Sequence, residues 1–171
     1  MRKLLLPLLL MLLFIGESIF VELMPEHLFG GSNIIAPRFL IVALLFLTVY
    51  GPRRYGILYS FVFGLLFDVV YTEIIGIYLF MFPLVAYIIL KLMKILQTNI
   101  VIVSIMVIIG IMLLELGVYE MYFLIHKTNM DFSTFLSLRL LPTTIFNMIF
   151  VILAAYPLKK YYDKLVASLD V

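Results

Sequence analysis

The stretch GILYSFVFGLLFDVVYTEIIGIYLFMFPLVAYIIL, from Gly56 to Leu90, decides how this chain folds. As one straight α-helix, these roughly 35 residues would extend about 52 Å, whereas the hydrocarbon core of a bilayer is only about 30 Å thick. The stretch must therefore turn back on itself. Only the region from Asp68 to Gly76 contains the polar residues and the glycine that a turn needs. The sequence thus predicts two membrane spans, at 56–71 and 76–90, joined by a tight, half-buried turn.

Four further apolar stretches flank this pair, and together they predict an all-α membrane protein. The chain has 171 residues, of which 65% are hydrophobic and 13% are charged. A soluble domain is nearer one-half apolar and about one-quarter charged. Six spans of about 20 residues would use most of the length, which leaves no room for a water-soluble catalytic domain. We predict one polytopic membrane domain over residues 1–171, with six spans at 4–24, 34–50, 56–71, 76–90, 100–125 and 140–158.

The distribution of Lys and Arg predicts the orientation of these spans. Of the 12 cations, nine lie at one set of span ends and three at the opposite ends. Positively charged loops stay in the cytoplasm, so we expect both termini there. An even number of spans independently requires both termini on the same side. The same cations suit anionic lipid head groups, and we expect no nucleic-acid partner. The nine are Arg2, Lys3, Arg53, Arg54, Lys91, Lys94, Lys159, Lys160 and Lys164.

Three carboxylates from three different spans are expected at one level of the outer half of the membrane. Counted from the cytoplasmic ends of their spans, Glu17, Asp68 and Glu115 lie about 20, 18 and 22 Å deep. A carboxylate there costs several kcal/mol unless it is paired, protonated or solvated. Arg38 and Arg139 lie near the outer ends of the second and sixth spans. We hypothesise that these five residues form a polar cavity or a partner-facing groove in the outer leaflet.

Two simpler interpretations of the same residues stay open. The carboxylates Glu17 and Glu115 would be purely structural if they are protonated and hydrogen-bonded between helices. Arg38 and Arg139 would contribute nothing to a cavity if their side chains only snorkel to the outer interface.

The sequence contains no motif for catalysis or for metal binding. It has no Cys, and its two histidines, His27 and His126, lack a ligand-spacing partner. A Gly-rich phosphate loop, a zinc-binding His pair and a Gly-x-Ser-x-Gly elbow are also missing from the sequence. We therefore predict a protein that is not an enzyme, with no catalytic residue, no metal and no cofactor.

The turn region carries a family resemblance. The sequence from Gly64 to Gly76 reads GLLFDVVYTEIIG and resembles the signature of the MreD family of bacterial rod-shape-determining proteins. That signature has a Gly-Leu-Leu-x-Asp element, a few variable residues and then Leu-Gly. Gly64, Asp68 and Gly76 match it, whereas Ile75 replaces the usual Leu. The length, the six spans and the start directly in a span are also similar to the family.

This resemblance implies a scaffold subunit of the cell-elongation machinery in the bacterial cell membrane. The implied partners are MreC, a single-span companion, and through it the RodA-type peptidoglycan polymerase, its transpeptidase partner and the actin-like filament protein, besides membrane lipids. The family also resembles in fold the substrate-binding subunits of energy-coupling-factor vitamin transporters. Of the functional positions of the family, only Gly64, Asp68 and Gly76 are assigned to this sequence.

Elementary physics assigns a structural role to each of these three residues. A Gly at position 64 lets a neighbouring helix approach closely. Gly76 permits the turn, and Asp68 is placed to accept backbone N–H groups that the turn leaves free.

The sequence therefore leaves three functions open. The first is a non-enzymatic scaffold that supports peptidoglycan synthesis and cell shape. The alternative is a solute-binding or transport subunit that uses the outer-leaflet polar layer as its pocket. A third is an intramembrane enzyme that acts on lipid-linked substrates, for which no residue spacing argues.

Overall fold

The structure is a computed structural model that describes residues 2–23 and 33–168. Within those residues it is all-helical and contains no strand. His27 and the end of the first expected span, at residue 24, lie outside the described residues. The helical elements are α1 (Arg2–Leu23), α2 (Phe39–Tyr50), α3 (Arg53–Tyr71), α4 (Ile77–Leu92), α5 (Ile100–Leu124), α6 (Phe132–Phe135), the π-helical segment η1 (Leu136–Leu140) and α7 (Leu141–Ala167).

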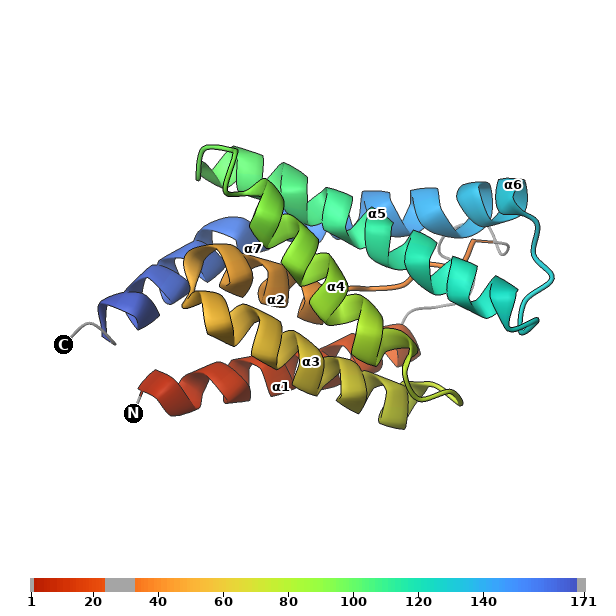
Figure 1. Cartoon of the computed structure of the whole chain (residues 1–171), viewed down its shortest axis with the longest axis horizontal. Helices are drawn as coiled ribbons and strands as arrows, with labels where there is room; N and C mark the ends of the chain where they lie inside the picture. Colours follow the sequence, from red (N-terminus) through yellow and green to blue (C-terminus); the bar gives the residue numbers. More distant parts are fainter. Residues whose placement is uncertain (1, 24–32, 169–171) are drawn as a thin grey trace.

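Successive helical rods run in opposite directions and pack side by side (Figure 1). The elements α6, η1 and α7 follow one another without a break and form the last rod. The start of α1 and the end of α7 lie at the same end of the molecule, at the left of Figure 1, which we call the terminal end. The turns after α3 and α5 lie at the opposite end, which we call the far end.

Four helices are long and apolar enough to cross a membrane, and two apolar helices are shorter. The long ones are Leu5–Leu23, Arg54–Tyr71, Ile100–Leu124 and Phe132–Ala167. The short ones, α2 and α4, have 12 and 16 residues, which corresponds to about 18 and 24 Å. Both therefore fall short of the roughly 30 Å of a hydrocarbon core. A short helix leaves its end groups inside the packed bundle, where they need partners from the protein.

The short helix α2 forms the centre of the bundle. Its residues from Leu40 to Leu47 are all at most 1% exposed. This helix packs against α1, α3, α4, α5 and α7. The faces of α1, α3 and α7 that point away from it expose large apolar side chains, as expected of surfaces that contact lipid.

Two expected spans differ from the helices observed. The second was expected from residue 34, yet α2 begins at Phe39 and residues 33–38 are not helical. Pro37 explains part of this, because proline disfavours a helical conformation in the residue before it. The last was expected at 140–158, yet the rod runs from Phe132 to Ala167. Hydropathy marks only the apolar part of a helix, and Asp131 caps this one earlier by accepting a hydrogen bond from the Thr134 N–H.

Helices α3 and α4 form the tightly packed hairpin that the opening stretch requires. At Gly64 a Cβ atom would lie 2.5 Å from the Tyr78 carbonyl oxygen and 3.1 Å from the Leu79 Cα. Real side chains do not tolerate such distances to backbone atoms, so only glycine allows α4 to approach this closely. The chain turns at Gly76, whose φ of +124° lies in the region that favours glycine.

The Gly64→Ala substitution is expected to separate α3 from α4 and to lower the thermal midpoint of unfolding by several degrees. Gly16→Ala is the matched control, because a Cβ at Gly16 meets nothing within 4 Å. The measurement is thermal unfolding of both variants in mild detergent. Equal midpoints for the two variants would show that the close approach at Gly64 is dispensable.

Candidate functional site

Asp68 completes the first turn of α4. Its carboxylate is fully buried and accepts hydrogen bonds from the backbone N–H groups of Gly76 (2.8 Å), Tyr78 (2.9 Å) and Leu79 (2.9 Å). The first N–H groups of a helix have no partner within the helix and are normally capped by the N-cap side chain. The N-cap of α4 is Gly76, which has no side chain. Asp68 of the preceding helix therefore supplies the capping group, with a negative charge at the positive end of the helix dipole.

Glu17 serves α2 in a similar way. Its carboxylate, in a residue only 6% exposed, accepts a hydrogen bond from the backbone N–H of Leu40 at 3.2 Å. Leu40 lies in the first turn of α2, whose N-cap Arg38 makes no side-chain capping hydrogen bond. Each of the two short helices thus begins at a carboxylate that comes from the helix before it in the sequence.

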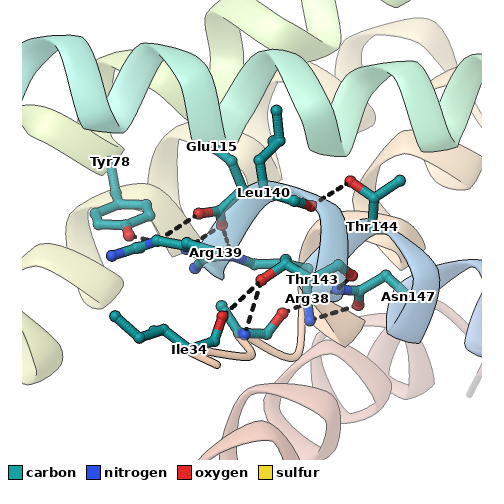
Figure 2. A network of polar contacts seen from close by, with 10 residues as sticks. Ile34, Arg38, Tyr78, Glu115, Arg139, Leu140, Thr143, Thr144 and Asn147 are labelled. Carbon is teal, nitrogen blue, oxygen red and sulfur yellow. Dashed lines mark hydrogen bonds and ion pairs between the residues drawn. The ribbon is translucent and has the colours of Figure 1, made fainter. Parts of the chain in front are cut away.

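The third buried carboxylate, Glu115 of α5, is shared by two arginines (Figure 2). Arg38 approaches one oxygen through Nε at 2.6 Å and Nη2 at 2.5 Å, and Arg139 Nε donates to the other at 3.0 Å. The side chains of Glu115 and Arg38 are 0% and 4% exposed. Buried charges are tolerated when they are paired and hydrogen-bonded, as these are. The arrangement joins α5, the start of α2 and segment η1.

Arg38 is held from several sides. Its backbone N–H donates to Asn147 Oδ1 at 2.8 Å, and its Nη2 donates to the Tyr78 hydroxyl at 3.1 Å. The guanidinium also lies over the rings of Phe67 and Tyr78, at 5.7 and 5.3 Å from their centroids, which is a favourable cation–π geometry. Tyr78 therefore connects the ion pairs to the Asp68 cap, which binds its backbone N–H.

The non-helical segment before α2 is bound by the last helical rod (Figure 2). Proline at position 142 has no N–H to donate to the carbonyl of Leu138, and that carbonyl instead accepts the backbone N–H of Ile34 at 2.8 Å. The backbone of Ala36 is bound on both sides, because its N–H donates to Thr143 Oγ1 and its carbonyl accepts from Asn147 Nδ2. Non-helical backbone is acceptable inside a membrane protein only when such partners satisfy it.

A cavity of about 400 Å³ lies beside this network, between α1, residues 35–38 and α3. Glu17 and Arg38 line it together with Glu22, Phe67 and Tyr71. A second cavity, of about 230 Å³, lies between α5, the loop after it and η1, and is lined by Arg139. Among residues 2–23 and 33–168, no three His, Cys, Asp or Glu side chains are grouped so that they could hold a metal ion.

The five residues of the hypothesised polar layer are therefore distributed over two connected arrangements. Glu115, Arg38 and Arg139 form the ion-pair cluster, and Glu17 lines the first cavity beside Arg38. Asp68 makes no ion pair with them and is connected through Tyr78. Thr143 and Asn147 also belong to the site, although neither is among the predicted site residues. One sequence signal could have identified them: two polar residues four positions apart in an apolar helix lie on the same helix face.

Replacing Glu115 with Gln is expected to lower the free energy of unfolding by about 3–5 kcal/mol, because the buried Arg38 and the half-buried Arg139 lose their shared partner. The matched control is Glu73→Gln, which breaks the exposed pair with Lys127 and is expected to cost less than about 1 kcal/mol. Denaturant titration in detergent measures both. A Glu115→Gln protein as stable as the control would contradict a structural role for the cluster.

Comparison with known proteins agrees with the motif in the α3–α4 hairpin. The family model described as rod shape-determining protein MreD matches residues 1–165. The rod shape-determining protein MreD of Bacillus subtilis (strain 168) is 33% identical over 165 residues, which cover 96% of each chain. The cell shape-determining protein MreD of Streptococcus pneumoniae (strain ATCC BAA-255 / R6) is 30% identical over 128 residues, 75% of this chain and 78% of that protein. No solved structure matches the chain significantly. The chain therefore belongs to the MreD family of rod shape-determining proteins, a membership that implies a role in cell shape.

Proposed function

We propose that this protein is a non-enzymatic scaffold subunit of the machinery that elongates rod-shaped bacterial cells and supports their peptidoglycan synthesis. The observation that carries the proposal is that the buried carboxylates of this protein bind other parts of the chain. Glu115 is bound by two arginines and Asp68 by three backbone amides, and both residues are at most 1% exposed. A catalytic acid or base must reach its substrate. These carboxylates instead hold helices together.

In this proposal the chain crosses the cell membrane six times, with both termini in the cytoplasm. The alternating direction of the helical rods supports six crossings, and the short α2 and α4 cross with the help of non-helical residues at their far ends (Figure 1). Three clusters of cations support the orientation, because they flank α3, α4 and the end of α7 at the terminal end.

The partner bound directly is an MreC-type protein with a single span, which connects this subunit to the RodA-type polymerase, its transpeptidase and the actin-like filament. We place its contact at the cavity between α1 and α3. Most of the outer surface is apolar and suits lipid tails, whereas this cavity is lined by the carboxylates of Glu17 and Glu22, besides Arg38, whose charge is already paired with Glu115. Two carboxylates beside an apolar groove favour a partner helix with a basic residue near its outer end.

The alternative function is a solute-binding or transport subunit with the fold of energy-coupling-factor substrate-binding proteins. The same cavity favours it, since about 400 Å³ falls within the range of small-molecule pockets. A subunit of this kind would purify with a bound small molecule and an ATPase module, whereas the scaffold would purify with a single-span wall-elongation protein.

Affinity purification from the native membrane distinguishes these functions and tests the contact surface. The unmodified protein is expected to recover the MreC-type partner and the polymerase in near-equal amounts. Ser18→Trp, which fills the α1–α3 cavity, is expected to reduce partner recovery at least tenfold. Ile152→Trp is the control, since Ile152 is 69% exposed on α7 and lines neither cavity.

Both variants must first reach the membrane in the same amount as the unmodified protein. Equal partner recovery by the two variants would move the contact away from this cavity. Recovery of an ATPase module with a small molecule would replace the scaffold by the transport subunit.

A further inference from the structure

The cavity between α5, the loop after it and η1 differs in charge from the one beside α1. Two cations, Lys127 and Arg139, line it, and no carboxylate does so within the part of the chain that the structure describes. Its remaining walls are tyrosines and apolar side chains, with Thr128 at the loop. A cavity with this lining is complementary to an anion that has an apolar neighbour.

Arg139 presents a guanidinium that is only partly used. Its Nε donates to Glu115, and its side chain is 30% exposed. Its two terminal nitrogens make no hydrogen bond to any of the residues that the structure describes. The Glu115 contact therefore fixes the plane of the guanidinium, and no residue of the described ranges binds its outer edge. Two parallel N–H groups on that edge match two oxygens of a phosphate.

The end of α5 places Lys127 at the same cavity. The Lys127 N–H donates to the Tyr122 carbonyl at 2.9 Å, and the His126 N–H donates to the Phe123 carbonyl at 3.1 Å. With His126 at φ +58°, these two bonds form the Schellman motif that closes many helices. The backbone at Lys127 is thereby anchored to α5, whereas its long, flexible side chain is able to exchange one partner for another.

Glu73, the present partner of Lys127, would compete only weakly with a bound anion. The Lys127 Nζ lies 3.2 Å from Glu73 Oε2, and the two side chains are 52% and 87% exposed. Such exposed pairs contribute little, because water screens them. The hydroxyls of Tyr122 and Thr128 add two donors at the cavity wall, since Thr128 Oγ1 accepts from the Met130 N–H and keeps its own hydrogen.

We propose that this cavity binds a phosphate group, with Arg139 and Lys127 as its cationic partners and the Tyr122 and Thr128 hydroxyls as further donors. In the proposed topology the cavity faces the outer interface, so the phosphate is that of a lipid head group or of a soluble phosphate compound. The volume of about 230 Å³ lies below that of drug-sized pockets and admits a head group rather than a large solute.

The test uses the full chain in nanodiscs of zwitterionic phosphatidylcholine, with phosphatidylglycerol added in steps and bound lipid counted by native mass spectrometry. We expect saturable binding of phosphatidylglycerol. Lys127→Gln should weaken this binding about fivefold, which is the contribution that one cation near a membrane surface makes to the affinity for an anionic lipid. Glu73→Gln should strengthen it by freeing Lys127. Lys160→Gln at the terminal end, a solvent-exposed lysine over Tyr156, should leave it unchanged.

A second arm adds pyrophosphate to the protein in pure phosphatidylcholine. If pyrophosphate binds and Lys127→Gln weakens it, the site takes phosphate from soluble compounds; if only phosphatidylglycerol binds, it takes lipid. The proposal is overturned if neither probe binds in preference to phosphatidylcholine, or if Lys127→Gln and Lys160→Gln weaken binding equally. All three variants are exposed substitutions, so unchanged thermal midpoints separate lost binding from lost folding. The outcome is independent of partner recovery, which tests the scaffold itself.

Discussion

Capping by buried carboxylates is the interaction on which the rest of this structure depends. Helices α2 and α4 are shorter than the hydrocarbon core of a bilayer, and their first turns begin inside the packed bundle, where free N–H groups need partners from the protein. Asp68 binds three of these groups at the start of α4, and Glu17 binds one at the start of α2. Because each carboxylate belongs to the preceding helix, capping also fixes how each helix pair is arranged. The carboxylates that an apolar bundle would normally avoid thus allow two short helices to begin inside it.

The cluster of Glu115, Arg38 and Arg139 extends this framework to the second half of the chain. It joins α5 and the last rod to the segment before α2, which Thr143 and Asn147 bind through its backbone. Proline at position 142 contributes by leaving the Leu138 carbonyl available for Ile34. Two cavities flank the cluster, one lined by Glu17, Glu22 and Arg38 and the other by Lys127 and Arg139. The cluster thus separates two cavities with different charged linings, which suits the proposed scaffold subunit.

The sequence predicted the all-helical class, the α3–α4 hairpin and the family, because length, hydropathy and the Gly64-to-Gly76 motif bear directly on them. It placed α2 five residues too early and the last rod too short, since hydropathy does not report where the N–H groups of residues 33–38 find partners. Depth along each helix predicted only that these charged residues share a level. It did not indicate their pairing, which depends on how each helix is rotated by packing. Arg38 pairs with Glu115 and not with Asp68. The reason is the position of Gly76, because the turn there directs three backbone N–H groups at the Asp68 carboxylate.

The most direct test of the capping account is amide hydrogen exchange at the starts of α2 and α4, measured on the intact protein in nanodiscs. The amides of Tyr78 and Leu79 are expected to exchange slowly in the unmodified protein. In Asp68→Ala they are expected to exchange at least a hundredfold faster, while the first turn of α5, capped by Asn99, keeps its protection. Fast exchange of these amides in the unmodified protein, or unchanged protection after the substitution, would contradict the claim that a buried carboxylate holds α4 in place.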